Sequence, residues 1–157
     1  MVDLDRMLEL LEEKRQRLLA FEEATQEMLT CRREQLEEQM KERQRLLEGI
    51  QRAEQELEEL CKEAGEEGEQ ALCAAQAGAE PSALPEELLP VYRAAMEVRT
   101  VLSRFPESEV QAMMRLRLEQ EQILEQIKNT NQGSAAKAAR FYSVGAGQGG
   151  GSRLGRA

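Results

Sequence analysis

The residues of this chain that could do chemistry are three cysteines, many glutamates and one glycine-rich run. Cys31, Cys61 and Cys73 form no C-x-x-C pair, and the chain has no histidine, so a zinc site would need an improbable set of thiolates and carboxylates. We expect these thiols to be structural and reduced. The run GAGQGGG near the C-terminus follows no predicted strand and opens no βαβ unit, so it does not fit a dinucleotide-binding loop.

The glutamates do not favour catalysis either. They occur in pairs along the N-terminal half, but carboxylates exposed along a helix lack the burial that separates two pKa values into an acid and a base. The sequence also has no G-x-S-x-G and no phosphate-binding loop between a strand and a helix. We expect no catalytic residues, no metal and no cofactor, and so a protein that is not an enzyme.

Charge excludes two classes of partner. The chain has a net charge of −9, and residues 1–131 hold 17 Lys and Arg against 30 Asp and Glu, a net charge of −13. Such a body repels phosphate groups, so we expect no nucleic-acid partner and no anionic membrane partner. No apolar run is long enough for membrane insertion, and MVDLDRML does not resemble a secretory signal. We therefore expect a cytoplasmic protein.

The N-terminal segment predicts one long helix over about residues 4–64. It contains no proline, and its residues are mostly strong helix formers. Asp3 or Asp5 can cap the start, and Gly65 and Gly68 mark the end. At ~1.5 Å per residue such a helix is roughly 90 Å long.

Apolar residues of this segment follow the seven-residue repeat of a coiled coil. One seam position holds Leu8, Leu29, Leu36, Ile50 and Leu57, and the other holds Leu4, Leu11, Leu18, Leu46, Ala53 and Leu60. Polar residues interrupt the middle of the seam, namely Arg15, Glu22, Thr25, Arg32, Gln39 and Arg43. We expect the ends of the helix to pack better than its centre. Other charges form a solvated face with pairs such as Glu37 and Lys41.

The remaining chain predicts a loop, two shorter helices and a tail. Residues 65–84 contain three glycines and Pro81 and keep a possible short helix at 69–77; helices over about 85–104 and 106–131 follow, with a bend before Pro106. Asn129, Asn131 and Gly133 should end the last helix. The fold class is all-α: a long N-terminal helix and two shorter return helices in an elongated, antiparallel, coiled-coil-like bundle over residues 1–131. Residues 132–157 form a flexible, glycine-rich, basic tail.

The last predicted helix carries the candidate partner-binding residues. Its apolar positions are Val110, Met113, Leu116, Ile123 and Ile127 on one side, extended by Met114, Leu118 and Leu124. Methionine fills irregular cores, but its flexible side chain also suits a groove that accepts a partner helix. Both interpretations stay open, and so does the face of the helix that looks inward.

Two adjacent aromatics, Phe141 and Tyr142, lie in the predicted tail. Such a pair on a flexible basic segment can form a short recognition element, because it offers a large apolar area with few rotatable bonds. Lys137 and Arg140 could steer the tail onto an acidic surface. Alternatively, the pair folds back and caps the bundle.

This layout resembles the FlgN family of flagellar export chaperones. The matching stretches are LELLEEKRQRLLAFEEATQEMLTCRREQLEEQMKERQRLLEGI at residues 8–50, RLEQEQILEQIKNTNQ at 117–132 and FYSVG at 141–145. The first resembles the family's leucine pairs flanking a Lys/Arg–Glu repeat, the second its terminal helix and the third its tail tyrosine before a glycine. The early end of the third helix and the glycine-rich tail depart from the family pattern.

The resemblance implies a cytoplasmic chaperone of type III export. It implies that residues 107–131 cover amphipathic terminal segments of hook-associated (hook–filament junction) proteins, and that Tyr142 contacts the export gate. We expect the free protein to be a monomer or a homodimer. Two alternatives stay open: a coiled-coil stalk or scaffold with no client, such as the antiparallel hairpin associated with the export ATPase, and a self-assembling oligomer.

Overall fold

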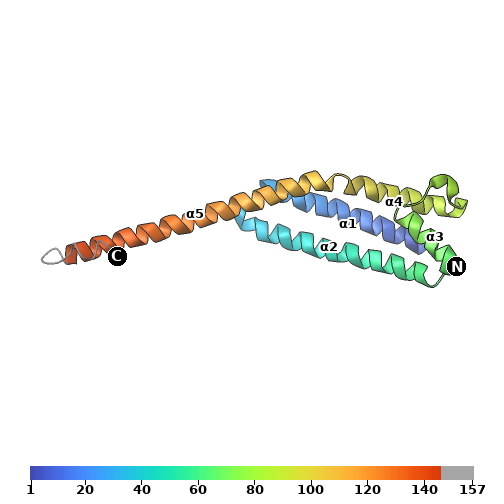
Figure 1. Ribbon diagram of the computed structural model, residues 1–157, viewed down its shortest axis with the longest axis horizontal. Helices are drawn as coiled ribbons and strands as arrows, with labels where there is room; N and C mark the ends of the chain where they lie inside the picture. The colour runs from blue at the N-terminus through green and yellow to red at the C-terminus, as the bar shows by residue number, and fades with distance from the viewer. Residues whose placement is uncertain (146–157) are drawn as a thin grey trace. The chain divides into compact units, whose positions relative to one another are not determined.

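The computed structural model describes residues 1–145, with side chains for residues 1–131. The helices are α1 (Leu4–Thr30), α2 (Arg33–Lys62), α3 (Gly65–Ala75), α4 (Leu89–Leu102) and α5 (Phe105–Gly145), with 3-10 turns η1 (Pro81–Ala83) and η2 (Glu86–Leu88) (Figure 1). No strand occurs within residues 1–145. The all-α fold class is confirmed.

The single helix predicted over 4–64 is wrong, because the chain folds back on itself at Cys31 and Arg32. Both residues are extended, with φ and ψ of −70° and 164° at Cys31 and −69° and 153° at Arg32. The resulting α1 and α2 lie antiparallel (Figure 1), as the contact of Arg17 Nη1 with the Gly49 carbonyl at 2.9 Å requires. A straight rod would leave its two apolar ends apart, whereas the hairpin lets them share one core.

Local side chains and glycines fix the ends of these helices. The Asp3 carboxylate accepts a hydrogen bond from the Arg6 backbone N–H at 3.0 Å, so Asp3 is the N-cap of α1. Gly65 follows α2 with φ of 60°, a conformation that favours glycine. Gly68 lies so close to the end of α2 that an added Cβ would meet the Cys61 carbonyl oxygen at 1.8 Å.

Helix α3 occupies the first half of the segment predicted as a loop. It begins at Gly65 and ends at Ala75, close to the short helix predicted at 69–77. Its end is a Schellman motif, in which the Gly78 N–H donates to the Cys73 carbonyl and the Ala77 N–H to the Ala74 carbonyl, both at 3.0 Å. Ala77 takes the left-handed position of this motif, with φ of 54°.

The main core lies where the two ends of the predicted rod meet. Its buried members include Met7, Leu10, Leu11 and Leu18 of α1, Ile50, Ala53, Leu57 and Cys61 of α2, Ala71 and Ala74 of α3, and Val91, Val98 and Val101 of α4. In this region α1 packs on α2 and α4, and α3 packs on the same two helices. The two ends of the predicted long helix pack in this core, as expected, because the hairpin brings them together.

Helix α4 does not return along the first helix as predicted, because α2 already returns. Arg15 of α1 lies 3.9 Å from Glu97 of α4, and Glu22 accepts hydrogen bonds from Arg104 at 2.8 and 3.0 Å. Helix α4 therefore runs in the same direction as α1. The predicted bend before Pro106 is confirmed as the break between Leu102 and Phe105.

Helix α5 continues past its predicted end at residue 131. Asn129, Asn131 and Gly133 lie inside the helix, which reaches Gly145. One helical glycine costs only about 1 kcal/mol relative to alanine, and the alanine-rich segment after it propagates the helix. The chain forms one compact unit over Met1–Arg115 and a second that begins at Leu116, whereas the predicted boundary was at residue 131. The flexible tail was predicted over residues 132–157, and its part over residues 146–157 lies outside the described residues.

None of the helices within the described residues is both long enough and apolar enough to cross a bilayer.

Candidate partner-binding surface on α5

The apolar side chains predicted to bind a partner are exposed in the described structure. Val110, Met113, Met114, Leu118, Ile123, Leu124 and Ile127 each expose between 40% and 65% of their surface. Leu116 is half-buried. Large apolar side chains that cluster on a surface mark sites of association.

Three of these side chains, Val110, Met113 and Met114, form a patch in the first unit, here called the Met patch. Residues three and four apart are neighbours on a helix surface, so Val110 adjoins both methionines. The buried side of this stretch is different, since Ser108 and Ala112 expose 8% and 0% of their surface. The helix thus presents small residues to the hairpin and its largest apolar side chains to solvent.

In the second unit four residues form the apolar stripe, defined as Leu116, Ile123, Leu124 and Ile127. With 3.6 residues per turn they fall within roughly 100° of one another around the helix. Leu118 lies on the opposite side by the same geometry. The predicted set therefore does not share one face, and Leu118 is separate from the stripe.

The Met patch is positioned by contacts between the start of α5 and the α1–α2 hairpin. The rings of Phe105 and Phe21 stack with centroids 5.3 Å apart. Arg43 of α2 places its guanidinium carbon 4.6 Å from the centroid of Phe21 and forms an ion pair with Glu109 of α5. The side chain of Arg43 is only 13% exposed. A charged residue in the predicted seam is expected to weaken helix packing there. Arg43 instead attaches α5 to the α1–α2 hairpin.

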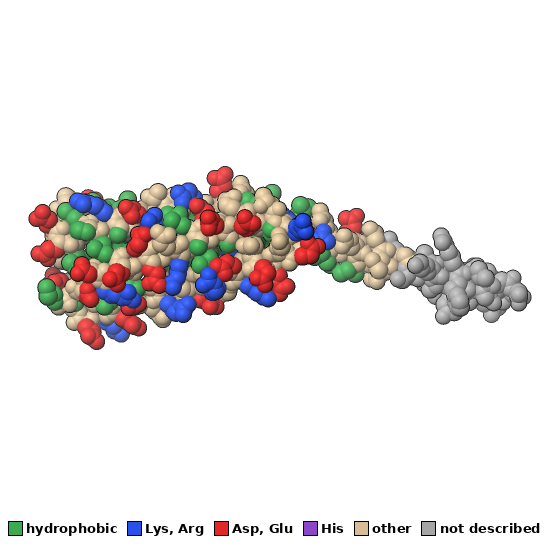
Figure 2. Space-filling model, turned by 180° about the vertical axis from the view of Figure 1, so that it is seen from behind, with side chains coloured by type: hydrophobic (Ala, Val, Ile, Leu, Met, Phe, Trp, Pro, Cys, Tyr) green, Lys and Arg blue, Asp and Glu red, His purple; other side chains and the backbone are tan. Residues whose placement is uncertain are grey.

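Charges on the first unit are paired and mixed. Arg6 donates to both carboxylate oxygens of Glu56, at 2.8 and 3.0 Å, and this hydrogen bonding raises the pKa of Arg6. The predicted pair of Glu37 and Lys41 is confirmed at 3.5 Å. On the face drawn in Figure 2, acidic and basic side chains are interspersed and do not gather into one basic patch.

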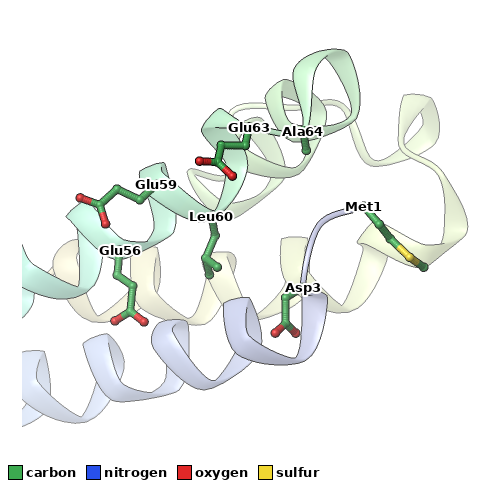
Figure 3. A pocket seen from close by; sticks show the side chains of 7 residues that line it. All are labelled: Met1, Asp3, Glu56, Glu59, Leu60, Glu63 and Ala64. Atoms are coloured by element: carbon green, nitrogen blue, oxygen red, sulfur yellow. The ribbon is translucent and has the colours of Figure 1, made fainter.

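An open depression of about 580 Å³ lies between the N-terminus and the end of α2. Its lining residues are Met1, Asp3, Glu56, Glu59, Leu60, Glu63 and Ala64. Figure 3 shows that the carboxylates do not converge on one point, and Glu59 and Glu63 are exposed. Catalysis by two carboxylates needs burial that separates their pKa values, so this depression does not form an acid–base site.

The three thiols differ in exposure. Cys31 and Cys61 are buried and Cys73 is exposed, and all three are free. Burial raises the pKa of Cys61, whose Sγ lies 4.0 Å from Met7 Sδ. Among the described residues no group of three or more His, Cys, Asp or Glu side chains could hold a metal ion.

The predicted recognition pair of Phe141 and Tyr142 lies within the backbone of α5. Their side chains lie outside the described residues, so their role stays a prediction. No protein-family model, curated protein or solved structure matches this chain. Its function is therefore inferred from its own surfaces and from the resemblance of its sequence.

Proposed function

We propose that this chain is a cytoplasmic, non-catalytic chaperone of flagellar type III export that binds the amphipathic terminal helices of hook-associated proteins. The observation that carries the proposal is the exposure of the Met patch and the apolar stripe on α5. The resemblance of residues 8–50, 117–132 and 141–145 to the FlgN family supplies the client class. The chaperone shields its client from premature association and then delivers it to the export gate.

The size of the exposed apolar surface supports binding. Burial of a large aliphatic side chain stabilises a complex by about 1.5–3 kcal/mol relative to full exposure. The Met patch in the first unit and the stripe in the second each offer three well-exposed side chains, and the stripe adds the half-buried Leu116. Even after the cost of ordering both partners, burial of such side chains suffices for a moderate affinity.

The shape of the surface favours a helical client. A narrow stripe on a helix pairs well with the apolar face of another helix, and methionine adapts to partners of different shape. Terminal segments of the junction proteins form coiled-coil cores only after assembly, so the free segments expose such a face. An incompletely ordered client loses conformational entropy on binding, which keeps release possible.

Light scattering of the full chain, alone and mixed with a hook–filament junction protein, tests the proposal. We expect a monomer or homodimer alone and a complex of defined stoichiometry in the mixture. The variant Met113→Asp/Ile123→Asp should lose the complex and keep its melting temperature, because both side chains are exposed. An unchanged mass for the wild-type mixture, or equal loss of binding and of melting temperature in the variant, would refute the proposal.

A stalk or scaffold without a client is the second candidate, and the α1–α2 hairpin favours it. The two helices are 27 and 30 residues long and lie antiparallel, as in a coiled-coil stalk. Packing of α4 along α1 and the exposed residues of α5 favour the chaperone instead. The same light-scattering experiment separates them, since a stalk forms no complex with the junction proteins.

A further inference from the structure

Helix α1 ends without the residues that normally cap a helix. The last four carbonyl groups of a helix have no partner within it, and a glycine or a basic side chain usually compensates. The last turn of α1 contains no basic residue, and the chain continues through the extended residues Cys31 and Arg32. The last turn of α1 itself therefore supplies neither of these usual caps.

Arg115 of α5 supplies this cap. Its Nη1 donates to the carbonyls of Met28 at 3.4 Å and Leu29 at 3.0 Å, and its Nη2 donates to the carbonyl of Cys31 at 2.8 Å. A cation at this position also interacts favourably with the negative end of the helix dipole. The turn between α1 and α2 is thus completed by a residue that lies more than eighty positions later, as the separations of 84 to 87 residues show.

A second arginine also connects α5 to the α1–α2 hairpin. Arg43 of α2 donates to Met28 Sδ at 3.3 Å, stacks over Phe21 and pairs with Glu109 of α5. Its Nε is buried without a hydrogen-bond partner within the described residues. Glu109 is the carboxylate that compensates this buried charge, so undocking of α5 would leave Arg43 uncompensated.

We propose that Arg43 and Arg115 form a clamp that couples the docking of residues 105–115 to the closure of the α1–α2 turn. A partner that displaces the start of α5 then opens this turn and exposes the buried Cys31 thiol. The clamp does not rest on the proposed function. It predicts a local opening that leaves the main core intact.

The chain contains its own reporters of this opening. Cys31 lies at the turn, Cys61 lies in the main core at 3% exposure, and Cys73 is exposed. Alkylation of the native full chain with iodoacetamide, followed by mass spectrometry of the three peptides, gives three rates. Cys73 reports reagent reactivity and Cys61 reports global unfolding.

Two variants open the clamp at different points. Glu109→Gln removes the charge that pairs with Arg43, and no described hydrogen bond joins Glu109 to Cys31. Arg115→Ala removes the side chain that caps α1. We expect each to accelerate labelling of Cys31 at least about tenfold while Cys61 and Cys73 keep their rates. Arg117→Ala, which removes an exposed arginine two residues later, is the matched control and should change nothing.

The rates decide the proposal in either direction. An unchanged Cys31 rate in Glu109→Gln would show that docking of α5 and closure of the turn are independent, and would overturn the clamp. Equal acceleration of Cys31 and Cys61 would also overturn it, because the variant would then loosen the whole unit. Arg115→Lys keeps the positive charge but loses the paired N–H donors of the guanidinium. A smaller acceleration of Cys31 labelling in this variant than in Arg115→Ala would support the clamp.

Discussion

At the residue scale, two glycines show how the neighbouring atoms determine whether a position can hold a side chain. A Cβ on Gly68 would meet the Cys61 carbonyl oxygen at 1.8 Å, and this atom belongs to the backbone of the adjoining helix. A Cβ on Gly49 would meet the guanidinium of Arg17 at 2.8 Å, which is the far end of a flexible side chain. The first contact cannot relax without moving α3, whereas the second can.

We therefore predict opposite outcomes for alanine at these two glycines. Gly68→Ala should lower the free energy of unfolding by about 1–3 kcal/mol or more, because overpacking forces the backbone to shift. Gly49→Ala should stay within about 1 kcal/mol of wild type, since the gain in helix propensity offsets the displacement of Arg17. Urea unfolding followed by circular dichroism measures both. Equal losses would mean that α3 does not approach α2 as described.

The candidate surface shows what residue patterns can and cannot predict. Met113, Met114 and Ile123 were identified from their type and spacing, and their exposure agrees with a binding role. The separation of Leu118 from the stripe follows from helix geometry alone. Arg43 and Arg115 were missed, because an arginine in an apolar seam and an arginine in a charged helix carry no local sign of their distant partners.

At the scale of the elements, the hairpin explains where stability resides. The ends of α1 and α2 that are farthest from the turn meet α3 and α4 in the main core. The turn at Cys31 and Arg32 has no glycine or proline to mark it, and a polar seam residue such as Arg32 predicts weaker packing there but not a break in the helix. Helix content was predictable from composition, whereas the fold-back depends on contacts between residues far apart in the chain.

Two alanine substitutions, one in the main core and one on the surface, measure this distribution of stability. Leu11→Ala removes a side chain that is 1% exposed in the main core, so the free energy of unfolding should fall by about 2–5 kcal/mol. Met40→Ala removes one that is 46% exposed, so the change should stay within about 0.5 kcal/mol. Thermal and urea unfolding of both variants provide the comparison. Comparable losses would place the core elsewhere.

Helix α5 offers a test at Gly133, which sits inside the helix with open space around it. Gly133→Ala should stabilise the helix locally by about 1 kcal/mol and raise the helical circular dichroism. Gly133→Pro should lower it, because proline removes a hydrogen bond and clashes with the preceding turn. If neither variant changes the spectrum, the segment after residue 131 is not helical and the sequence prediction of an end there was right.

At the scale of the whole molecule, client binding and delivery should separate along the chain. Removal of residues 132–157 should leave client binding within about twofold, because the Met patch and the stripe remain. Delivery in an export assay should fall, and Tyr142→Ala alone should reproduce that loss. The helical signal should fall by the share of residues 132–145. Loss of client binding on truncation would instead make this segment part of the binding surface.

Client binding by the apolar stripe is tested most directly by calorimetric titration of the full chain with a peptide. The peptide is the terminal helix of a hook–filament junction protein. Ile123→Asp should weaken binding at least about tenfold, whereas Leu118→Asp, which adds the same charge on the opposite side of the same helix, should stay within about twofold. Both variants should melt like wild type, since both side chains are exposed. Equal weakening by the two variants, or no binding by wild type, would contradict the claim that this face of α5 holds a client helix.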